Sequence, residues 1–307
     1  MSTHSIEFSN VTKRFRRHFW TASKLAIDNC SFTIDKNAVT GFVGPNGAGK
    51  TTSIKMILGL VRPERGFIRI NGLDPRATSS RTGVSFLSER PYFYDHLTVA
   101  ETLRFALRLQ GGRSSSETTA ISKALDEVEL GSVSSMMVKD LSKGMQQRLS
   151  MAQALLCDPA LFILDEPMTG LDPLGRRLFR TIISTLGRQG KTVFFSSHIL
   201  DDVESLCTKV VVLSKGRCAY QGAISTLLSQ GFLGTELTVS GLGNETRAGL
   251  AALGFSVTGT EPGESVIFVK KNQDLRKCQA FLYEHGIACE SIAKRNASLE
   301  DFVYKQQ

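Results

Sequence analysis

The sequence predicts an α/β protein of two domains, one over residues 1–230 and a smaller one over residues 231–307. Apolar strands alternate with helical segments through the first region, which implies a mainly parallel sheet covered by helices on both faces. The order of elements then changes to β-α-β-β-α-β, the ferredoxin-like or split βαβ plan of a small α+β domain. Glycines punctuate the junction between the two patterns: Gly231, Gly234, Gly241 and Gly243.

The first domain begins with three short strands, which we expect over residues 5–11, 29–34 and 38–44. The third of these strands is apolar and runs directly into a glycine-rich loop. We expect a helix over residues 51–60, which Pro63 ends because proline does not continue a helix.

The rest of the first domain alternates strands and helices. A helix begins at Thr98, where Thr98 and Glu101 form a capping box, and Gly111 ends it. The other expected elements are a strand over 66–72 with an Asn-Gly turn, a strand over 83–87, helices over 117–130, 141–156 and 173–186, buried strands over 160–164 and 191–197, and a hairpin over 209–222.

The smaller domain contains shorter elements. We expect strands over 236–242, 255–260, 265–270 and 287–294, helices over 246–254 and 274–286, and a last short helix over 298–305. No catalytic group of residues is evident after residue 231, so this domain is interpreted as structural, regulatory or dimer-forming.

Composition limits the class of protein. Hydrophobic residues make up 41% of the 307 residues, enough for a sizeable core. No apolar run reaches the ~18 to 20 residues that span a bilayer, and the N-terminus lacks the apolar core of a signal peptide, so we expect a cytoplasmic protein. Six scattered cysteines without a Cys-x-x-Cys pair argue against zinc sites and a disulfide framework.

The positive charge is concentrated in the first domain. The net charge is +8, whereas residues 231–307 carry eight Lys or Arg against nine Asp or Glu, so the first 230 residues carry +9. Such an excess suits nucleotide phosphates, anionic lipid headgroups or nucleic acid, and charge alone does not choose among them.

The segment GPNGAGKTT matches the phosphate-binding pattern G-x-x-x-x-G-K-[ST] between a strand and a helix. Its glycines allow the backbone to wrap phosphates, and the loop N–H groups and the helix N-terminus face the anion. Lys50 reaches the β- and γ-phosphates, and the Thr51 hydroxyl is a ligand for Mg²⁺. The expected nucleotide-binding residues are Gly44, Pro45, Asn46, Gly47, Ala48, Gly49, Lys50, Thr51 and Thr52.

Two further segments bring polar groups to the same edge of the predicted sheet. The buried strand LFIL delivers Asp165 and Glu166 to its carboxyl end, where ligands of parallel sheets bind. Asp165 suits the Mg²⁺ shell, and Glu166 suits the activation of a water molecule. His198 follows the strand TVFFSS and is a candidate contact for the γ-phosphate.

A second anion-binding feature occurs in LSKGMQQR, where Ser142 and Gly144 precede a helix. Together with the preceding segments, this order resembles the ATPase subunits of ABC transporters over roughly residues 5 to 222, and LSKGMQQR resembles the family's LSGGQ-type signature. The resemblance implies a P-loop NTPase domain with a helical subdomain, and a Mg²⁺-dependent ATPase that binds ATP.

In that family two ATPase domains pack head to tail around two ATP molecules, and the signature of one domain caps the γ-phosphate held by the P-loop of the other. The resemblance therefore implies that Ser142 and Gly144 contact the nucleotide of a second copy. One P-loop and one signature occur in this chain, so we expect it to pair with itself or with a close relative.

Other segments extend the resemblance. TGLDP resembles the D-loop, in which Asp172 would couple the two nucleotide sites. Glu89 stands where the family usually has the glutamine of its Q-loop, and our hypothesis is that Glu89 still senses the metal and the attacking water. An aromatic residue that stacks on adenine lies upstream of the P-loop in the family. Phe15 matches that local pattern, while Phe19 and Trp20 are alternatives, and the basic-aromatic run around them also suits lipid headgroups.

The resemblance favours an exporter subunit. The SLEDF segment near the end resembles type-2 exporter ATPases, which work with a separate polytopic permease. We therefore expect a peripheral protein at the cytoplasmic face of the plasma membrane, with residues 86–110 in contact with the permease. The transported cargo does not follow from the sequence.

Two alternative functions fit the sequence less well. A soluble ABC ATPase of ribosomes or DNA is disfavoured, because such relatives carry paired ATPase domains or long coiled coils, so no nucleic-acid partner is expected. A nucleotide-binding scaffold without activity is disfavoured because Glu166 and His198 are present.

Overall fold

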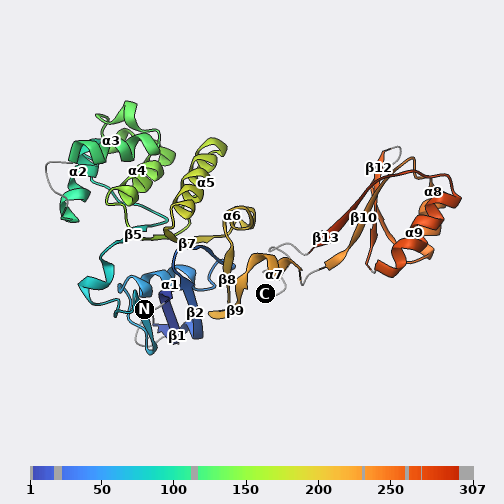
Figure 1. Cartoon of the computed structure of the whole chain (residues 1–307), viewed down its shortest axis with the longest axis horizontal. Coiled ribbons are helices and arrows are strands. Elements are labelled where there is room, and N and C mark those ends of the chain that lie inside the picture. The colour runs from blue at the N-terminus through green and yellow to red at the C-terminus, as the bar shows by residue number, and fades with distance from the viewer. Residues whose placement is uncertain are drawn as a thin grey trace. The chain divides into compact units, whose positions relative to one another are not determined.

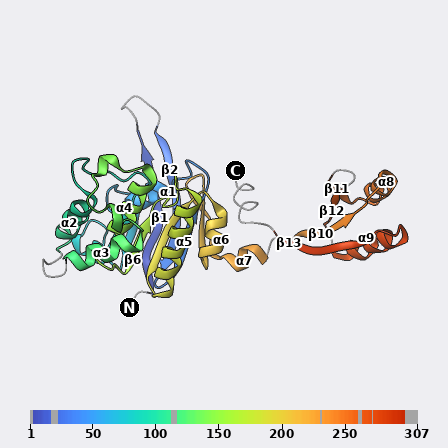
Figure 2. The ribbon, with the colours of Figure 1, turned by 90° about the horizontal axis from the view of Figure 1, so that it is seen from above.

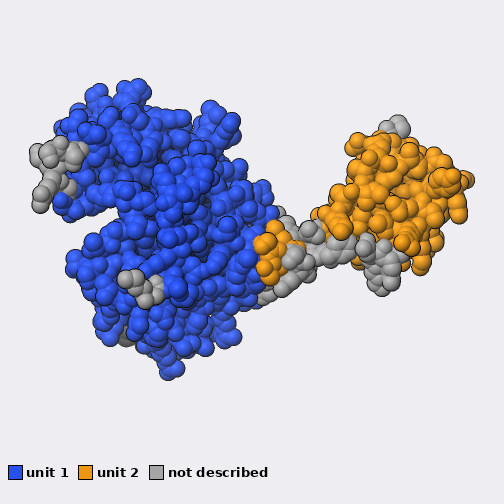
Figure 3. Space-filling model, in the orientation of Figure 1, with its two compact units in different colours: residues 1–224, 303–307 blue, residues 225–302 orange. Residues whose placement is uncertain are grey.

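The computed structural model describes residues 3–16, 23–111, 117–229, 232–259, 263–270 and 272–296. The chain divides into two compact units (Figure 3). The first comprises Met1–Ile224 with Val303–Gln307, and the second comprises Ser225–Phe302. The sequence predicts a domain boundary near residue 231, and the two compact units divide at residue 225.

The first unit contains two sheets and a set of helices. Its strands are β1 (His4–Phe15), β2 (Lys24–Asp35), β3 (Val39–Val43), β4 (Arg65–Ile70), β5 (Val84–Leu87), β6 (Leu161–Leu164), β7 (Thr192–Ser197), β8 (Lys209–Ser214) and β9 (Arg217–Ala223). Its helices are α1 (Lys50–Ile57), α2 (Val99–Leu109), α3 (Glu117–Glu127), α4 (Lys143–Leu155), α5 (Pro173–Arg188) and α6 (Leu200–Leu206), and α7 (Ile224–Ser229) follows at the junction of the units.

The larger sheet carries the site. Its strand order is β5-β6-β7-β3-β8-β9, with parallel pairing from β5 to β8 and an antiparallel edge strand β9. All residues of β3, β6 and β7 are buried, as expected for a parallel sheet covered on both faces. The predicted mainly parallel sheet is confirmed.

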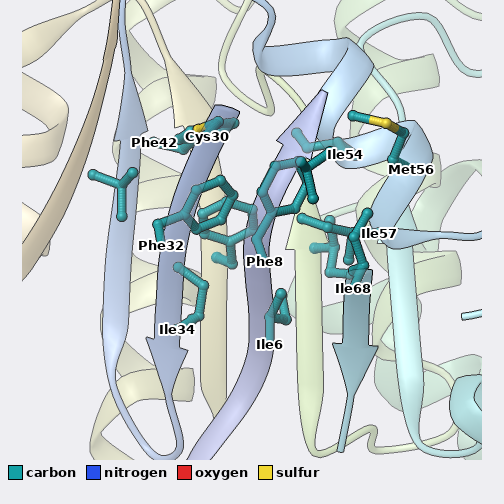
Figure 4. Packing of buried hydrophobic residues seen from close by; sticks show 14 of the residues in the cluster. Ile6, Phe8, Cys30, Phe32, Ile34, Phe42, Ile54, Met56, Ile57 and Ile68 are labelled. Carbon is teal, nitrogen blue, oxygen red and sulfur yellow. The ribbon is translucent and has the colours of Figure 1, made fainter. Parts of the chain in front are cut away.

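The smaller sheet packs its apolar face onto the larger one. It is antiparallel with the order β2-β1-β4, and its inward side chains share one core with α1 and the central strands of the larger sheet. Figure 4 shows Phe8, Phe32 and Phe42 within this core. The rings of Phe8 and Phe32 stack with centroids 4.6 Å apart. This core holds the loop before α1 against both sheets.

Three helices form a separate group within the first unit. In Figures 1 and 2, α2, α3 and α4 lie together, and each contacts the other two. The predicted capping box is confirmed, since the Thr98 hydroxyl accepts the Glu101 N–H and the Glu101 carboxylate accepts the Thr98 N–H. Gly111, two residues beyond the end of α2, adopts a φ of 79°, which suits a helix stop.

The second unit has the element order β10 (Phe232–Ser240), α8 (Asn244–Ala252), β11 (Ser256–Thr258), β12 (Glu264–Val269), α9 (Asn272–Glu284) and β13 (Cys289–Asn296). Its antiparallel sheet has the order β11-β12-β10-β13. This topology is that of the split βαβ plan. A core of apolar side chains from β10, β12, α8 and α9 supports it. The short helix expected over residues 298–305 lies outside the described residues.

Candidate functional site

At two positions of the glycine-rich loop between β3 and α1, Gly44 and Gly49, a side chain does not fit. A Cβ on Gly44 would lie 2.2 Å from the carbonyl oxygen of Leu213. Gly49 has a φ of 109°, and a Cβ there would lie 2.8 Å from the carbonyl oxygen of Ala26. These contacts and conformations require glycine, and they turn the loop so that α1 begins at Lys50 with no side-chain cap on its free N–H groups.

Lys50 is buried at the start of α1 with its ammonium inside the loop. Its Nζ donates a hydrogen bond of 2.6 Å to the carbonyl oxygen of Gly44 and lies 3.8 Å from Oε1 of Glu166. Burial lowers the pKa of Lys50, while the charges of Glu166 and Asp165 act to raise it. The site therefore holds the desolvated ammonium of Lys50 at the N-terminus of α1, where phosphate oxygens bind favourably.

Asp165 directly follows the last residue of β6 and is buried. Burial raises the pKa of its carboxyl group, while hydrogen bonds from Ser196 and Thr51 act to lower it. The Thr51 hydroxyl and the Asp165 carboxylate are therefore neighbours. In the described residues no group of three or more His, Cys, Asp or Glu is able to hold a metal ion alone. One hydroxyl and one carboxylate fit Mg²⁺, which completes its shell with water and substrate phosphates.

Glu166 stands in an unusual backbone conformation for its type, with a φ of 49°. Its Oε2 lies 2.7 Å from Nδ1 of His198 and accepts a hydrogen bond of 3.3 Å from the Thr169 hydroxyl. The direction of the His198 hydrogen bond depends on the imidazole tautomer. The carboxylate is thus positioned between a cation, Lys50, and an imidazole.

Most of the expected site residues line a single cavity of about 440 Å³, whereas Gly44, Ala48 and Asp165 do not line it. Its lining residues come from β1, β2, the loop, the first turn of α1 and the segments that follow β5, β6 and β7: Phe15, Lys24, Leu25, Ala26, Pro45, Asn46, Gly47, Gly49, Lys50, Thr51, Thr52, Glu89, Glu166, Thr169 and His198. The volume lies within the range of small-molecule sites. Phosphate-binding, carboxylate and aromatic groups therefore face one space.

Phe15 and Glu89 both reach this cavity. The Phe15 ring is partly exposed, and the Lys13 ammonium lies 5.3 Å from its centroid. Glu89 is exposed, and its carboxylate lies 3.8 Å from the Arg90 guanidinium. The alternative stacking residues Phe19 and Trp20 lie outside the described residues.

The signature residues do not line this cavity. The Ser142 hydroxyl caps α4 by accepting a hydrogen bond of 3.2 Å from the Met145 N–H. A Cβ on Gly144 would approach only Leu171, at 4.0 Å. Asp172 likewise caps α5 by accepting the Gly175 N–H. Within one copy, Ser142 and Asp172 therefore cap the N-termini of α4 and α5.

Sequence reasoning missed several residues of the site. Thr169 and the β2 residues Lys24, Leu25 and Ala26 line the cavity, and the buried Ser196 contacts the two carboxylate residues. For Ser196 the available signal was a hydroxyl within the otherwise apolar buried strand TVFFSS. No local pattern marked the β2 residues, because their proximity depends on the pairing of β1 with β2.

A loop of this geometry beside the buried Asp165 and the adjoining Glu166 is typical of a P-loop nucleotide-binding domain. Comparison with known sequences gives the family: a profile described as ABC transporter matches residues 27–169. An uncharacterised ABC transporter ATP-binding protein of Nostoc sp. is 43% identical over 226 residues, which is 72% of this chain and 67% of that protein.

Two further relatives match at lower identity. The Nod factor export ATP-binding protein I of Burkholderia orbicola is 35% identical over 230 residues, 74% of each chain. The uncharacterised ABC transporter ATP-binding protein YcbN of Bacillus subtilis is 32% identical over 312 residues, covering 99% of this chain and 97% of that protein. The similarity to YcbN therefore extends through the second unit.

Solved structures share the fold of the first unit. An ATP-binding subunit of an ABC transporter matches with a TM-score of 0.66 and 31% identity, covering 73% of this chain and 92% of that chain. A dimeric ATP-binding cassette bound to ADP and phosphate matches with a TM-score of 0.66 and 21% identity, over 71% of this chain and 98% of that chain. The second similarity is one of fold.

The chain belongs to the ATP-binding proteins of ABC transporters, and it is a nucleotide-binding ATPase of that family. None of the helices in the described part of the chain is long and apolar enough to span a membrane.

Proposed function

We propose that this chain powers export through a separate membrane permease, as one half of a head-to-tail pair of copies that close on ATP and open after hydrolysis. The observation that carries this proposal is the division of the phosphate-binding features. The loop, Glu166 and His198 line one cavity, whereas Ser142 and Gly144 lie outside it, and a Cβ on Gly144 would approach only Leu171, at 4.0 Å. A second copy is the natural partner for such a divided site.

The export direction rests on relatives. The Burkholderia orbicola relative is an export ATP-binding protein by name, and its match spans 74% of both chains. Specificity for the cargo would lie in the permease.

Each residue of the cavity has a role in the proposed hydrolysis. Lys50 and the loop N–H groups would bind the β- and γ-phosphates, and Phe15 would stack on adenine. Glu166 would orient the attacking water and accept its proton, while His198 would contact the γ-phosphate and hold the Glu166 carboxylate at its present angle. Charge stabilisation by these fixed groups would supply most of the catalysis.

Thr51 and Asp165 would hold Mg²⁺, with Glu89 next to its water shell. When bound, the ion would neutralise charge on the β- and γ-phosphates. Glu89 is a charged residue at the position where the family usually has glutamine. Glu89→Gln is expected to preserve coupled transport. A loss of transport in that variant would show that the carboxylate has a separate role.

Residues 86–110 would contact the permease. This segment exposes aromatic side chains, with Tyr92 at 88% exposure, and the rings of Tyr94 and Phe105 pack edge to face at 5.8 Å. Exposed aromatic groups are typical of protein interfaces. The chain would then sit at the cytoplasmic face of the plasma membrane through this partner. Purification from detergent extracts tests this point: a polytopic membrane partner supports it, and co-purified RNA or DNA contradicts it.

Residues 1–230 would form the ATP-binding domain and residues 231–307 an accessory domain with a regulatory or dimerising role. The second unit has its own apolar core, which supports independent folding. Removing residues 231–307 is expected to leave nucleotide binding intact. Loss of nucleotide binding by the folded remainder would contradict this division.

The head-to-tail arrangement is tested by complementation. Lys50→Ala damages the loop, and Gly144→Ala damages the signature face without a clash inside one copy, since the nearest atom lies 4.0 Å from the new Cβ. Each variant alone is expected to be inactive. An equimolar mixture should recover activity, because a mixed pair contains one intact composite site.

One outcome of the complementation experiment would contradict a site shared between copies. If the mixture stays as inactive as each variant alone, although Gly144→Ala still binds Mg-ATP and the two variants pair with each other, the site is not shared between copies. Glu166→Gln with saturating Mg-ATP gives the second test: light scattering should detect a stable dimer, and a strict monomer in the presence of the permease would contradict the proposal.

A further inference from the structure

The Ser196 hydroxyl lies between the two acidic residues of the site. It donates a hydrogen bond of 2.6 Å to Oδ1 of Asp165 and accepts one of 2.9 Å from the backbone N–H of Glu166. A hydroxyl has one proton to donate, so the proton is committed to Asp165 and a lone pair of the oxygen to Glu166. One oxygen atom therefore contacts both residues.

Strand register explains this placement. β6 and β7 are parallel neighbours, and Leu164 pairs with Phe195. The next residue on each strand is therefore Asp165 and Ser196, at the edge where the cavity opens. Ser196 is fully buried, so its hydroxyl has no access to bulk water as an alternative partner.

The backbone of Glu166 needs such an anchor. Its φ of 49° is in the left-handed region, which a non-glycine residue occupies only when the surroundings hold it there. This conformation directs the carboxylate toward His198 and Lys50. The hydrogen bond from the Glu166 N–H to Ser196 holds the peptide unit at which the chain changes direction.

We propose that Ser196 is a positioning residue for the ATPase reaction: its hydroxyl fixes the orientation of Asp165 toward the metal and the angle at which Glu166 faces the attacking water. This inference rests on the roles proposed above for Asp165 and Glu166. Ser196 does not line the cavity, so it would not contact a nucleotide bound there. Its effect is transmitted only through the two carboxylate residues.

The test compares Ser196→Ala with a matched variant on the same strand. Thr192 is also buried in β7, and its hydroxyl accepts the Asn37 N–H at 2.9 Å and contacts the Ser5 hydroxyl at 3.3 Å, far from any carboxylate of the site. Thr192→Val removes these hydrogen bonds and keeps the shape of the side chain. Both variants lose a buried hydroxyl, so their losses of folding stability are comparable.

The first measurement separates turnover from binding. In the full chain, Ser196→Ala is expected to lower kcat by roughly 10- to 100-fold, the usual effect of removing a group that orients metal or catalytic ligands. The Kd for ATP measured without metal should change by less than about threefold, because Ser196 does not contact the nucleotide. Thr192→Val should leave both values unchanged. Ser196→Thr, which restores a hydroxyl, should recover part of kcat.

The second measurement does not depend on turnover. In the Glu166→Gln background, ATP binding is measured as a function of the Mg²⁺ concentration. Adding Ser196→Ala should raise the Mg²⁺ concentration for half-saturation by about tenfold, because Asp165 loses its hydrogen bond. Adding Thr192→Val should not.

The outcomes distinguish this inference from the proposed function. If Glu166→Gln abolishes turnover and Ser196→Ala behaves like Thr192→Val in both measurements, Ser196 is only structural and the inference is overturned. If Glu166→Gln retains turnover, the role proposed for Glu166 is overturned instead. Should Ser196→Ala fold poorly, Ser196→Thr is compared with wild type in the Mg²⁺ titration. A half-saturating Mg²⁺ concentration close to that of wild type supports the inference, because the hydroxyl is kept. A roughly tenfold higher concentration despite the retained hydroxyl contradicts it.

Discussion

Glu166→Gln removes one negative charge from the cavity and keeps the size of the side chain. The Glu166 carboxylate lies 3.8 Å from the Lys50 ammonium, and both side chains are about nine-tenths buried. At an effective dielectric constant of about 20, this separation corresponds to roughly 4 kcal/mol of attraction. Desolvation of the two charges offsets much of it, as in other buried pairs.

Removing the charge also relieves a repulsion. Burial is the main cause that raises the pKa of Asp165, and the Glu166 charge adds to it, so the variant should shift that pKa part of the way back toward its ordinary value. Because the lost attraction and the relieved repulsion oppose each other, the free energy of unfolding should change by no more than about 1 to 2 kcal/mol. ATP binding should remain, since the loop and Lys50 keep their hydrogen bond.

Turnover should fall much further than stability. Loss of a general base typically lowers the rate by about 10²- to 10⁴-fold, which corresponds to about 3 to 5 kcal/mol in the activation barrier. The assay is release of phosphate at saturating Mg-ATP, together with the Kd of a fluorescent ATP analogue. Stability is measured in parallel by urea unfolding.

Glu117→Gln is a matched control. The Glu117 side chain has the same exposure as that of Glu166, 11%, and its carboxylate bonds to the Arg108 guanidinium at 3.0 Å. It lies in α3, outside the cavity. Its loss should affect stability but not turnover. If Glu166→Gln keeps turnover within about threefold of wild type, or if both variants lose it equally, the reasoning about Glu166 is refuted.

Gly49→Ala should destabilise the chain and abolish ATP binding, because the new Cβ would lie 2.8 Å from a backbone oxygen. Gly47→Ala should lower the free energy of unfolding by only roughly 1 kcal/mol, because its φ is positive but no atom lies within 4 Å of the new Cβ. Equal free energies of unfolding for the two variants would contradict this contrast. Thr98→Ala should lower the free energy of unfolding by about 1 kcal/mol through loss of the capping box with Glu101, and urea unfolding that shows no change would contradict it. Hydrogen bonds from Lys209 and His4 hold the pKa of Asp35 below its usual value. The stabilisation of the folded state by these bonds is therefore present above pH ~4 and is lost as the pH falls through the folded pKa. Asp35→Asn should therefore flatten the acid side of the curve of unfolding free energy against pH, by less than about 1 kcal/mol because the pair is partly exposed, and an unchanged curve would argue against it.

The local elements of this protein could be read from its sequence because their determinants are local. The strand before Gly44 and the helix after it were predicted from apolar runs and glycines within a few residues. The capping box at Thr98 and Glu101 needed only a spacing of three residues. Alternation of such elements is sufficient to predict a mainly parallel sheet.

Element ends were less well predicted. The strand expected over residues 5–11 continues to Phe15, and the strand expected over residues 29–34 begins at Lys24. The pairing of β1 with β2 extends both strands, and no local pattern reports that pairing. This extension brings Phe15 and Lys24 to the cavity.

The amino-acid sequence by itself determined which groups are available for phosphate chemistry: the glycine loop, Lys50, and the two carboxylates after one strand. Tertiary structure alone decided how they meet, because distance across the sheet depends on strand order and register rather than on separation along the chain. The pairing of Leu164 with Phe195 places Ser196 against Asp165, thirty-one residues away. The same packing leaves Ser142 and Gly144 outside the cavity, so whether the site is complete in one copy is a property of the fold and of its assembly.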